Sequence, residues 1–249
     1  KNFFFGRREP WAKTRWVDCC DVATLKRLAV KYRLHPLAVE DAITAARAKI
    51  DRYESHYFIC MPLIHLVNAE QPRIPDRAGQ SCCRWCRREK PLTPFKASSI
   101  AVEMVSLFVI RTSSTLITFS SPAEEKNSDE LWRSRPVAEL SRPDSRLRLY
   151  EHQYLTYSIL DTLVDSLFPF IEKIRDLIEE EEKRLPHDSL RLHNDAFVKD
   201  IRSALRRALR KLRPVGRVLT HIIEDPNFCD NVTLFSEMST TISRLWKMN

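Results

Sequence analysis

The pattern of hydrophobic positions divides the chain into a mixed first part and a helical second part. Up to about residue 119, short β-branched and aromatic runs alternate with segments of helical spacing. These runs predict strands over residues 14–20, 57–67, 100–112 and 115–120, with a polar turn between the last two. Pro62 cannot donate to a strand ladder, so we expect part of the second strand to lie at a sheet edge or bulge.

Two short helices are expected between the first two strands. Asp21 is placed to cap the first of them. Its apolar residues follow at helical spacing, namely Leu25, Leu28, Ala29 and Tyr32. The dipeptide His35-Pro36 is expected to begin the second helix, because proline is tolerated in the first turn.

Residues 68–99 differ in character from the segments on either side of them. They contain four prolines, seven basic residues and few large apolar ones, which predicts a loop or disordered insert. Cys82, Cys83 and Cys86 lie in this insert. A structural zinc site needs four ligands, and no second Cys or His pair follows at suitable spacing, so we interpret these cysteines as free thiols.

From about residue 151 the apolar spacing becomes helical over two long stretches. One short helix is expected before them, around residues 130–135. Asp188 is placed to cap the second long helix, and Pro169 and Pro214 are expected to kink their helices without ending them. The two helices, near 35 residues each, should form an antiparallel hairpin roughly 50 Å long. A third helical stripe begins near residue 231 and is still running at Asn249.

Composition excludes several classes of protein. Only three glycines accompany fourteen prolines, which disfavours an all-β fold and nucleotide-binding glycine loops. We see no catalytic Ser-His-Asp or Cys-His arrangement and do not expect an enzyme. No apolar run reaches eighteen residues, so no segment of this sequence is expected to span a bilayer. The chain begins with Lys1 and not Met, and we interpret it as a piece of a longer protein.

Charge also separates the two long helices. Residues 151–184 carry nine acidic and four basic side chains, whereas residues 196–217 carry eight basic and one acidic. The net charge of +8 permits several kinds of acidic partner and selects none. The basic segment has no interleaved aromatic residues, so nucleic acid is not an expected partner. The acidic neighbouring helix is the favoured partner.

Four motifs in order resemble the CorA family of Mg2+ channels: HPLAVED (35–41), AKIDRYESHYFI (48–59), TLITF (115–119) and YLTYSILDTLVDSLFPFIEKI (154–174). The resemblance implies an α/β (α+β) fold, an α/β/α sandwich with a mixed central sheet. A long antiparallel helical hairpin and the start of a stalk helix should follow. The corresponding division is 1–144 for the sandwich, 145–225 for the hairpin and 226–249 for the stalk.

Paired carboxylates suggest where a metal would bind. Glu40 and Asp41 are adjacent near the end of a short helix, and Asp161 and Asp165 share one helical face. Mg2+ keeps much of its water and is held by one or two carboxylates. The resemblance implies a Mg2+ sensor site shared between subunits, with Glu237 of the stalk as a further ligand. Alternatively, Asp161 and Asp165 pair with arginines of the second hairpin helix.

The resemblance implies that the chain is the cytosolic sensing and gating domain of a divalent cation channel. The full-length channel would be a homo-oligomer, and a pentamer is expected. Its ion would be Mg2+, with Co2+, Ni2+ or Zn2+ as alternatives, and its membrane helices would lie beyond this sequence. The plasma membrane is the expected location. Two other hypotheses stay open: a zinc or other transition-metal transporter on the same scaffold, and a soluble helical interaction module.

Overall fold

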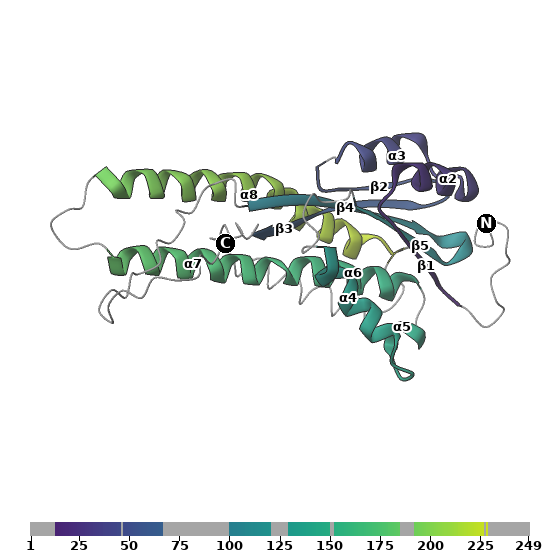
Figure 1. Cartoon of the computed structure of the whole chain (residues 1–249). Coiled ribbons are helices and arrows are strands. Elements are labelled where there is room, and N and C mark those ends of the chain that lie inside the picture. The colour runs from purple at the N-terminus through teal and green to yellow at the C-terminus, as the bar shows by residue number, and fades with distance from the viewer. Residues whose placement is uncertain are drawn as a thin grey trace, which may run out of the picture.

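A five-stranded mixed sheet forms the centre of the molecule (Figure 1). The computed structural model describes residues 13–45, 47–66, 100–120, 129–149, 152–184, 192–226 and 228. The strands are β1 (Arg15–Cys19), β2 (Lys49–Arg52), β3 (Tyr57–Leu66), β4 (Ile100–Ile110) and β5 (Thr115–Ser120), in the spatial order β1-β5-β4-β3-β2. β1 pairs parallel with β5 and the other pairs are antiparallel, so the expected mixed sheet is confirmed.

Pro62 lies where the sequence predicted an edge. β3 pairs with β4 along its whole length, from Tyr57 opposite Val109 to Leu66 opposite Ile100. The pairing of β2 with β3 covers only Tyr57 to Cys60. Pro62 therefore falls in the half of β3 that, among the described strands, pairs only with β4, where a proline is better tolerated than in a strand paired on both sides.

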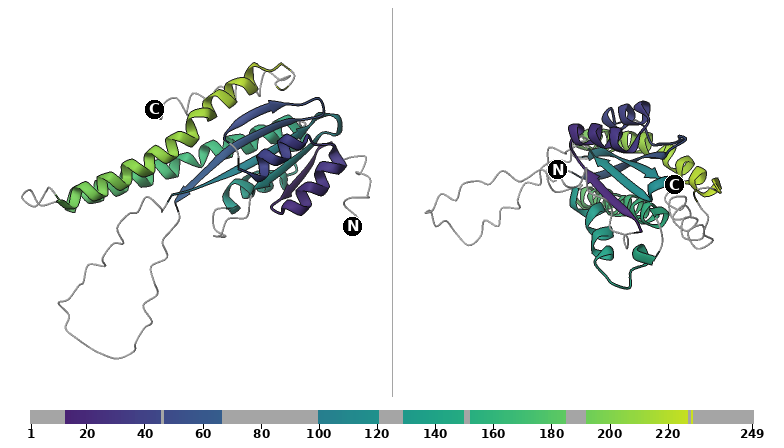
Figure 2. Two further views of the ribbon diagram at one scale, coloured as in Figure 1. Left: turned by 90° about the horizontal axis from the view of Figure 1, so that it is seen from above. Right: turned by 90° about the vertical axis from the view of Figure 1, so that its right-hand side faces the viewer.

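Helices cover both faces of the sheet, as the end-on view of Figure 2 shows. Helices α2 (Val22–Tyr32) and α3 (Pro36–Ile43) pack on the face that presents Phe58 and Phe108. Helix α6 (His152–Asp165) and the end of α8 (Leu192–Glu224) pack on the other face. The expected α/β/α sandwich is confirmed.

The caps of the first two helices follow the sequence prediction. The Asp21 carboxylate accepts a hydrogen bond of 2.8 Å from the backbone N–H of Thr24. At α3, the Nδ1 atom of His35 accepts from the backbone N–H of Leu37 at 3.2 Å, and Pro36 occupies the first turn. Each cap pairs one of the N–H groups that a helix start leaves without an intrahelical partner.

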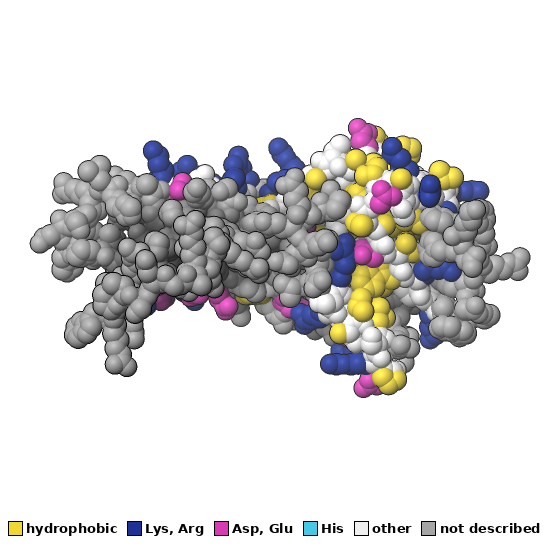
Figure 3. Space-filling model, in the orientation of Figure 1, with side chains coloured by type: hydrophobic (Ala, Val, Ile, Leu, Met, Phe, Trp, Pro, Cys, Tyr) yellow, Lys and Arg dark blue, Asp and Glu magenta, His cyan; other side chains and the backbone are white. Residues whose placement is uncertain are grey.

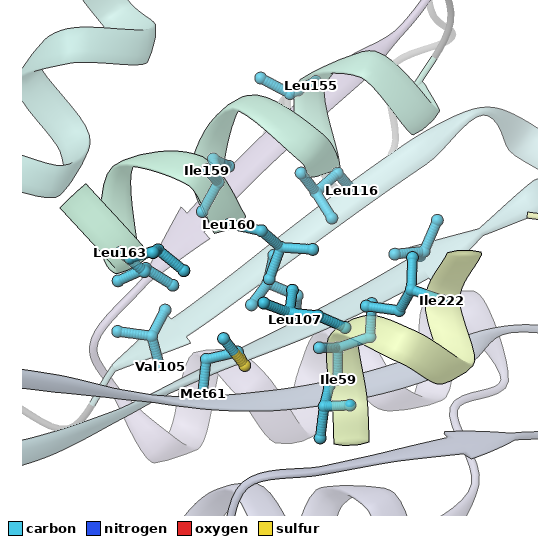
Figure 4. Packing of buried hydrophobic residues seen from close by; sticks show 14 of the residues in the cluster. Ile59, Met61, Val105, Leu107, Leu116, Leu155, Ile159, Leu160, Leu163 and Ile222 are labelled. Carbon is cyan, nitrogen blue, oxygen red and sulfur yellow. The ribbon is translucent and has the colours of Figure 1, made fainter. Parts of the chain in front are cut away.

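The larger hydrophobic core lies between the sheet and α6 (Figure 4). It is built from alternate residues of the strands, helical residues of α6 and the last turns of α8. The residues labelled in Figure 4 are Ile59, Met61, Val105, Leu107, Leu116, Leu155, Ile159, Leu160, Leu163 and Ile222. The strand residues of intervening register face the α2–α3 side, which is the period of two expected for a sheet covered on both faces.

The second half forms the antiparallel hairpin, with α7 (Leu167–Arg184) and α8 running in opposite directions (Figure 1). Ile64, Leu167, Ile174, Ala204 and Ala208 form a buried cluster between these two helices and β3. The 33 residues of α8 correspond to about 50 Å.

The two expected kinks have different outcomes. α8 continues through Pro214, as expected. The first long helix is instead interrupted at Ser166, three residues before Pro169, so the expected single helix is two helices, α6 and α7. A proline removes the N–H that would bond to the carbonyl four residues earlier, here that of Asp165, which accounts for a break at this point.

Three short elements differ from the sequence prediction, and two predicted segments lie mostly outside the described residues. Helix α4 (Asp129–Leu140) is longer than expected and contains Pro136, while α5 (Arg146–Leu149) and strand β2 were not predicted. The 68–99 insert with its cysteines and the stalk segment 226–249 lie almost wholly outside the described residues. The division at residues 144 and 225 stays a prediction.

Candidate metal site on α3

Helix α3 presents its two carboxylates in different environments. The side chain of Glu40 is exposed and, among the described residues, has no ion-pair partner. The Asp41 carboxylate instead accepts a hydrogen bond of 2.5 Å from Lys49 Nζ at the start of β2. Lys49 also lies 2.7 Å from Asp51, so one ammonium bridges two carboxylates. Of the two acids proposed as ligands, Glu40 is the one open to a cation from solvent.

The ammonium of Lys49 is held in its charged form. Partial burial lowers its pKa, but the hydrogen bonds and charges of Asp41 and Asp51 outweigh burial and raise the pKa above its usual range. Lys49 therefore stays protonated at neutral pH and occupies a place beside Asp41 that a metal cation would otherwise share.

Glu40 lies beside an apolar surface on α2 and α3. Val30, Leu37 and Ile43 are exposed by 83%, 57% and 37%, although large aliphatic side chains are usually buried. A shallow hollow of about 590 Å³ is lined by Lys26, Ala29, Val30, Leu34, Pro36, Val39, Glu40, Ile43 and Thr44. Such a surface next to a carboxylate has the composition of a protein contact.

Asp165, one of the second pair of carboxylates, is held by an arginine of α4. Arg135 of α4 donates a hydrogen bond of 2.6 Å to the Asp165 carboxylate. This hydrogen bond raises the pKa of Arg135. Burial lowers that pKa by a smaller amount, and the negative charges of Asp165 and Asp161 raise it further. Asp165 thus has an arginine partner on α4, which packs directly against α6. Pairing of Asp161 and Asp165 with arginines of the second hairpin helix stays a prediction.

One chain does not bring the two carboxylate pairs together. α3 packs on one face of the sheet and α6 on the opposite face. In the described ranges, no group of three or more His, Cys, Asp or Glu side chains is placed to hold a metal. Glu237 lies outside the described residues. A site that joins Glu40 with carboxylates of α6 would therefore need a second subunit.

Histidine takes a structural role next to α3. His35 stacks on Tyr53 with ring centroids 4.5 Å apart, and Tyr53 stacks on His56 at 5.0 Å. His56 is 1% exposed, and burial together with the charge of His35 lowers its pKa to about 4. This imidazole is neutral at pH 7 and packs against Phe108. The interpretation of His35 as a structural residue at the helix start is confirmed.

The donor set suits a hard cation bound loosely. Carboxylate oxygens match Mg2+, which keeps several waters and takes only one or two protein carboxylates. No cysteine or histidine of the described residues joins Glu40 in a cluster, as a zinc site would require. Glu40 is therefore the carboxylate of α3 that is open to such a cation.

Sequence reasoning missed the two cations that hold the carboxylates. Lys49 follows Asp41 by eight residues across a chain reversal, and Arg135 precedes Asp165 by thirty. Neither spacing has a helical or strand period, so no local pattern pairs them. The signal in the sequence was indirect. Lys49 and Asp51 are two residues apart and therefore lie on the same side of β2. A prediction of this strand would have placed Lys49 beside an acidic residue.

The sequence is similar to that of a curated protein from a bacterium. No family model matches it. It is 26% identical over 197 residues to "Putative metal ion transporter YfjQ" of Bacillus subtilis (strain 168), covering 77% of this chain and 48% of that protein. The chain thus spans about half the length of this curated relative. In the ranges the structure describes, each helix is too short or too polar to cross a bilayer.

Solved structures agree with this relationship at the level of the fold. The full-length CmaX protein matches over 96% of this chain and 64% of its own, with a TM-score of 0.64 and 12% identity. The soluble domain of CorA from Methanocaldococcus jannaschii matches over 93% and 86%, with a TM-score of 0.56 and 15% identity. The complete CorA magnesium transporter of the same organism matches over 94% and 67%, with a TM-score of 0.56 and 14% identity. The chain therefore has the fold of the soluble domain of CorA, and the resemblance seen in its sequence is confirmed.

Proposed function

We propose that this chain is the cytosolic metal-sensing domain of a divalent cation transporter, with Mg2+ as its ion. The relationship in sequence to a protein named as a metal ion transporter, and the fold of the CorA soluble domain, support the class. The observation that carries the sensing role is Glu40, an exposed carboxylate beside exposed Val30, Leu37 and Ile43. This combination suits a metal site at a contact between subunits.

The proposed assembly is a homo-oligomer, with a pentamer as the expected state. The apolar surface of α2 and α3 would pack against a neighbouring subunit and place Glu40 near acidic residues of that subunit. The α6 carboxylates Asp161 and Asp165 and the stalk residue Glu237 are the proposed partners. Since α3 and α6 cover opposite faces of one sheet, the contact between copies would bring these residues together.

The proposed mechanism follows from charge. Mg2+ between subunits offsets the repulsion of facing carboxylates and stabilises a symmetric closed arrangement. When Mg2+ leaves, like charges face each other at a low-dielectric contact and the subunits separate. The metal shifts this equilibrium only by its differential affinity for the two arrangements, so a modest difference of about 1.4 kcal/mol changes their ratio tenfold.

The proposal places the pore and the membrane helices outside this sequence and the chain on the cytosolic face of the plasma membrane. The relatives whose names state an activity are transporters, and no enzymatic reaction is assigned. Oxygen ligands favour Mg2+ over Zn2+, while Co2+ and Ni2+ are secondary candidates. The zinc-transporter alternative would need nitrogen or sulfur ligands near Glu40, and none is clustered with it among the described residues.

A flux experiment tests the sensing role. The protein that contains this chain is reconstituted in liposomes, and Mg2+ uptake is followed with high or low Mg2+ on the domain side. The unsubstituted protein should close as Mg2+ rises on that side, and Glu40→Gln should need a several-fold higher concentration to close. Asp144→Asn, an exposed carboxylate in the α4–α5 connection, is the matched control. Equal Mg2+ dependence in all three proteins would overturn the proposed role of Glu40.

A further inference from the structure

A basic pocket lies along α8. Its volume is about 770 Å³. The described residues that line it are Arg47, Val102, Arg207, Arg210, Lys211, Arg213, Pro214 and Arg217; six of these are cationic and none is acidic. The residues come from α8, β4 and the connection before β2, so three segments far apart in sequence converge on it. Figure 3 shows Lys and Arg side chains projecting along the α8 side of the molecule.

These six cations lack a carboxylate partner among the residues that the structure describes. The acidic helix α7 was the expected partner, and its exposed residues Glu172, Asp176 and Glu179 do not pair with α8. The Arg210 Nε atom donates to the backbone oxygen of Arg206, at 3.3 Å.

Packing of α8 rests mainly on apolar side chains. Apolar side chains hold the helix against the rest of the fold, and the buried ones are Ile201, Ala204, Ala208, Val215, Val218, Leu219 and Ile222. On the basic side, residues 207, 210, 211, 213 and 217 repeat at helical spacings of three and four. Like charges at these spacings repel and weaken a helix. A bound anion would remove that repulsion.

We propose that this pocket binds a compact polyphosphate anion and recognises it through its phosphates. Guanidinium groups donate paired hydrogen bonds to phosphate oxygens, and several converging arginines suit a ligand with several adjacent phosphates. The volume fits a small molecule. No aromatic side chain of the described residues lines the pocket, so the phosphate chain and not a nucleobase should set the affinity.

The neighbouring surface of α8 provides a matched control. A second hollow is lined by Lys199, Arg202, Ser203, Arg206, Leu209, Arg210 and Arg213. Arg207, Lys211 and Arg217 line only the proposed pocket, whereas Lys199, Arg202 and Arg206 line only this second hollow. Replacing either set of three by glutamine removes the same charge from the same helix. The two triple variants therefore separate a pocket from a generally basic helix.

The test is calorimetry of sodium tripolyphosphate with the 249-residue chain at low ionic strength, in the presence of EDTA. Because metal is absent, the result is independent of the proposed Mg2+ site. We expect one tripolyphosphate per chain, affinity lowered at least tenfold in R207Q/K211Q/R217Q, and affinity within about twofold in K199Q/R202Q/R206Q. ATP should bind about as well as tripolyphosphate, and orthophosphate much more weakly. Circular dichroism confirms that both variants fold.

Three results would overturn the proposal. The first is no binding of tripolyphosphate, and the second is equal weakening in both triple variants, which would show attraction to overall charge. The third is co-sedimentation with vesicles containing phosphatidylinositol bisphosphate without any binding of tripolyphosphate, which would make this face a lipid-binding surface. Binding of tripolyphosphate that is lost only in the pocket variant supports a soluble polyphosphate as the ligand.

Discussion

Lys49 Nζ lies 2.5 Å from the Asp41 carboxylate, and the same ammonium lies 2.7 Å from Asp51. This side-chain bridge ties the end of α3 to the edge strand β2. It also places the positive charge of Lys49 on Asp41, the residue that follows Glu40 in α3. The structure therefore holds a protein cation next to the place where we propose a metal cation, and the two must compete for Asp41.

Removing that lysine should strengthen metal binding. Lys49→Gln frees the Asp41 carboxylate, and we expect Mg2+ affinity of the assembled protein to rise about fivefold, consistent with the ~1 kcal/mol of a half-exposed ion pair. The measurement is calorimetric titration with Mg2+. Lys13→Gln, at the opposite edge of the sheet, should leave the affinity unchanged. An unchanged affinity in Lys49→Gln would show that Asp41 takes no part in binding.

The Arg135–Asp165 pair should contribute modestly to stability. Arg135 is 58% and Asp165 27% exposed, so solvent screens the pair and we expect Asp165→Asn to lower the free energy of unfolding by about 0.5–1 kcal/mol. Arg135→Gln should have a similar effect, and the double variant should be no worse than either single one. Denaturant unfolding measures all three. Fully additive losses would show that the two side chains do not interact.

Acid should destabilise the fold through His56. Its pKa in the folded state is about 4, below the ordinary value near 6.5, so the unfolded chain binds the additional proton between these values. The contribution is present above pH 6.5 and is lost as the pH falls toward 4. Between pH 7.5 and pH 5 we expect a loss of about 2 kcal/mol from this group.

The His56 variant isolates this effect from the carboxylates. His56→Phe keeps an aromatic ring against Tyr53 and Phe108, so unfolding free energies at pH 7.5 and pH 5 should differ by about 2 kcal/mol less than in the unsubstituted chain. His221→Gln, an exposed histidine of α8, should retain the full difference. If His56→Phe retains it as well, the burial argument for His56 is wrong.

The exposed apolar residues of α2 and α3 should affect assembly and not folding. Val30→Glu with Leu37→Glu changes two side chains that are 83% and 57% exposed, so the unfolding free energy should change by less than about 0.5 kcal/mol. Oligomers of the protein should dissociate in sedimentation velocity measurements. Leu107→Ala, a buried control, should instead cost about 2–5 kcal/mol in stability. Oligomers that persist in the double variant would exclude this surface as the subunit contact.

Most of the fold could be predicted because its signals are local. Asp21 and His35 are capping residues next to the helices they begin, and short runs of apolar, β-branched and aromatic residues mark strands β3 to β5. Strand β2 is four residues long and half-buried, too short for a period to stand out. Helix α4 was underestimated because Pro136 interrupts its pattern, although the helix continues through it.

The candidate site was harder to predict than the fold, for a physical reason. Carboxylates such as Glu40 and Asp41 are visible in a sequence, but the cations that neutralise them arrive from other elements through tertiary packing. Lys49 reaches Asp41 from β2, and Arg135 reaches Asp165 from α4. Whether a carboxylate is open to a metal is decided by those contacts, and residue identity and spacing do not encode them.

Calorimetric titration of Mg2+ into the assembled protein tests the central claim most directly, with Glu40→Gln compared against Asp144→Asn. Both variants remove one exposed carboxylate, from opposite faces of the sheet. We expect saturable Mg2+ binding that weakens at least tenfold in Glu40→Gln and stays unchanged in Asp144→Asn. Absence of Mg2+ binding, or equal affinity in the two variants, would contradict the assignment of α3 as half of a metal site between subunits.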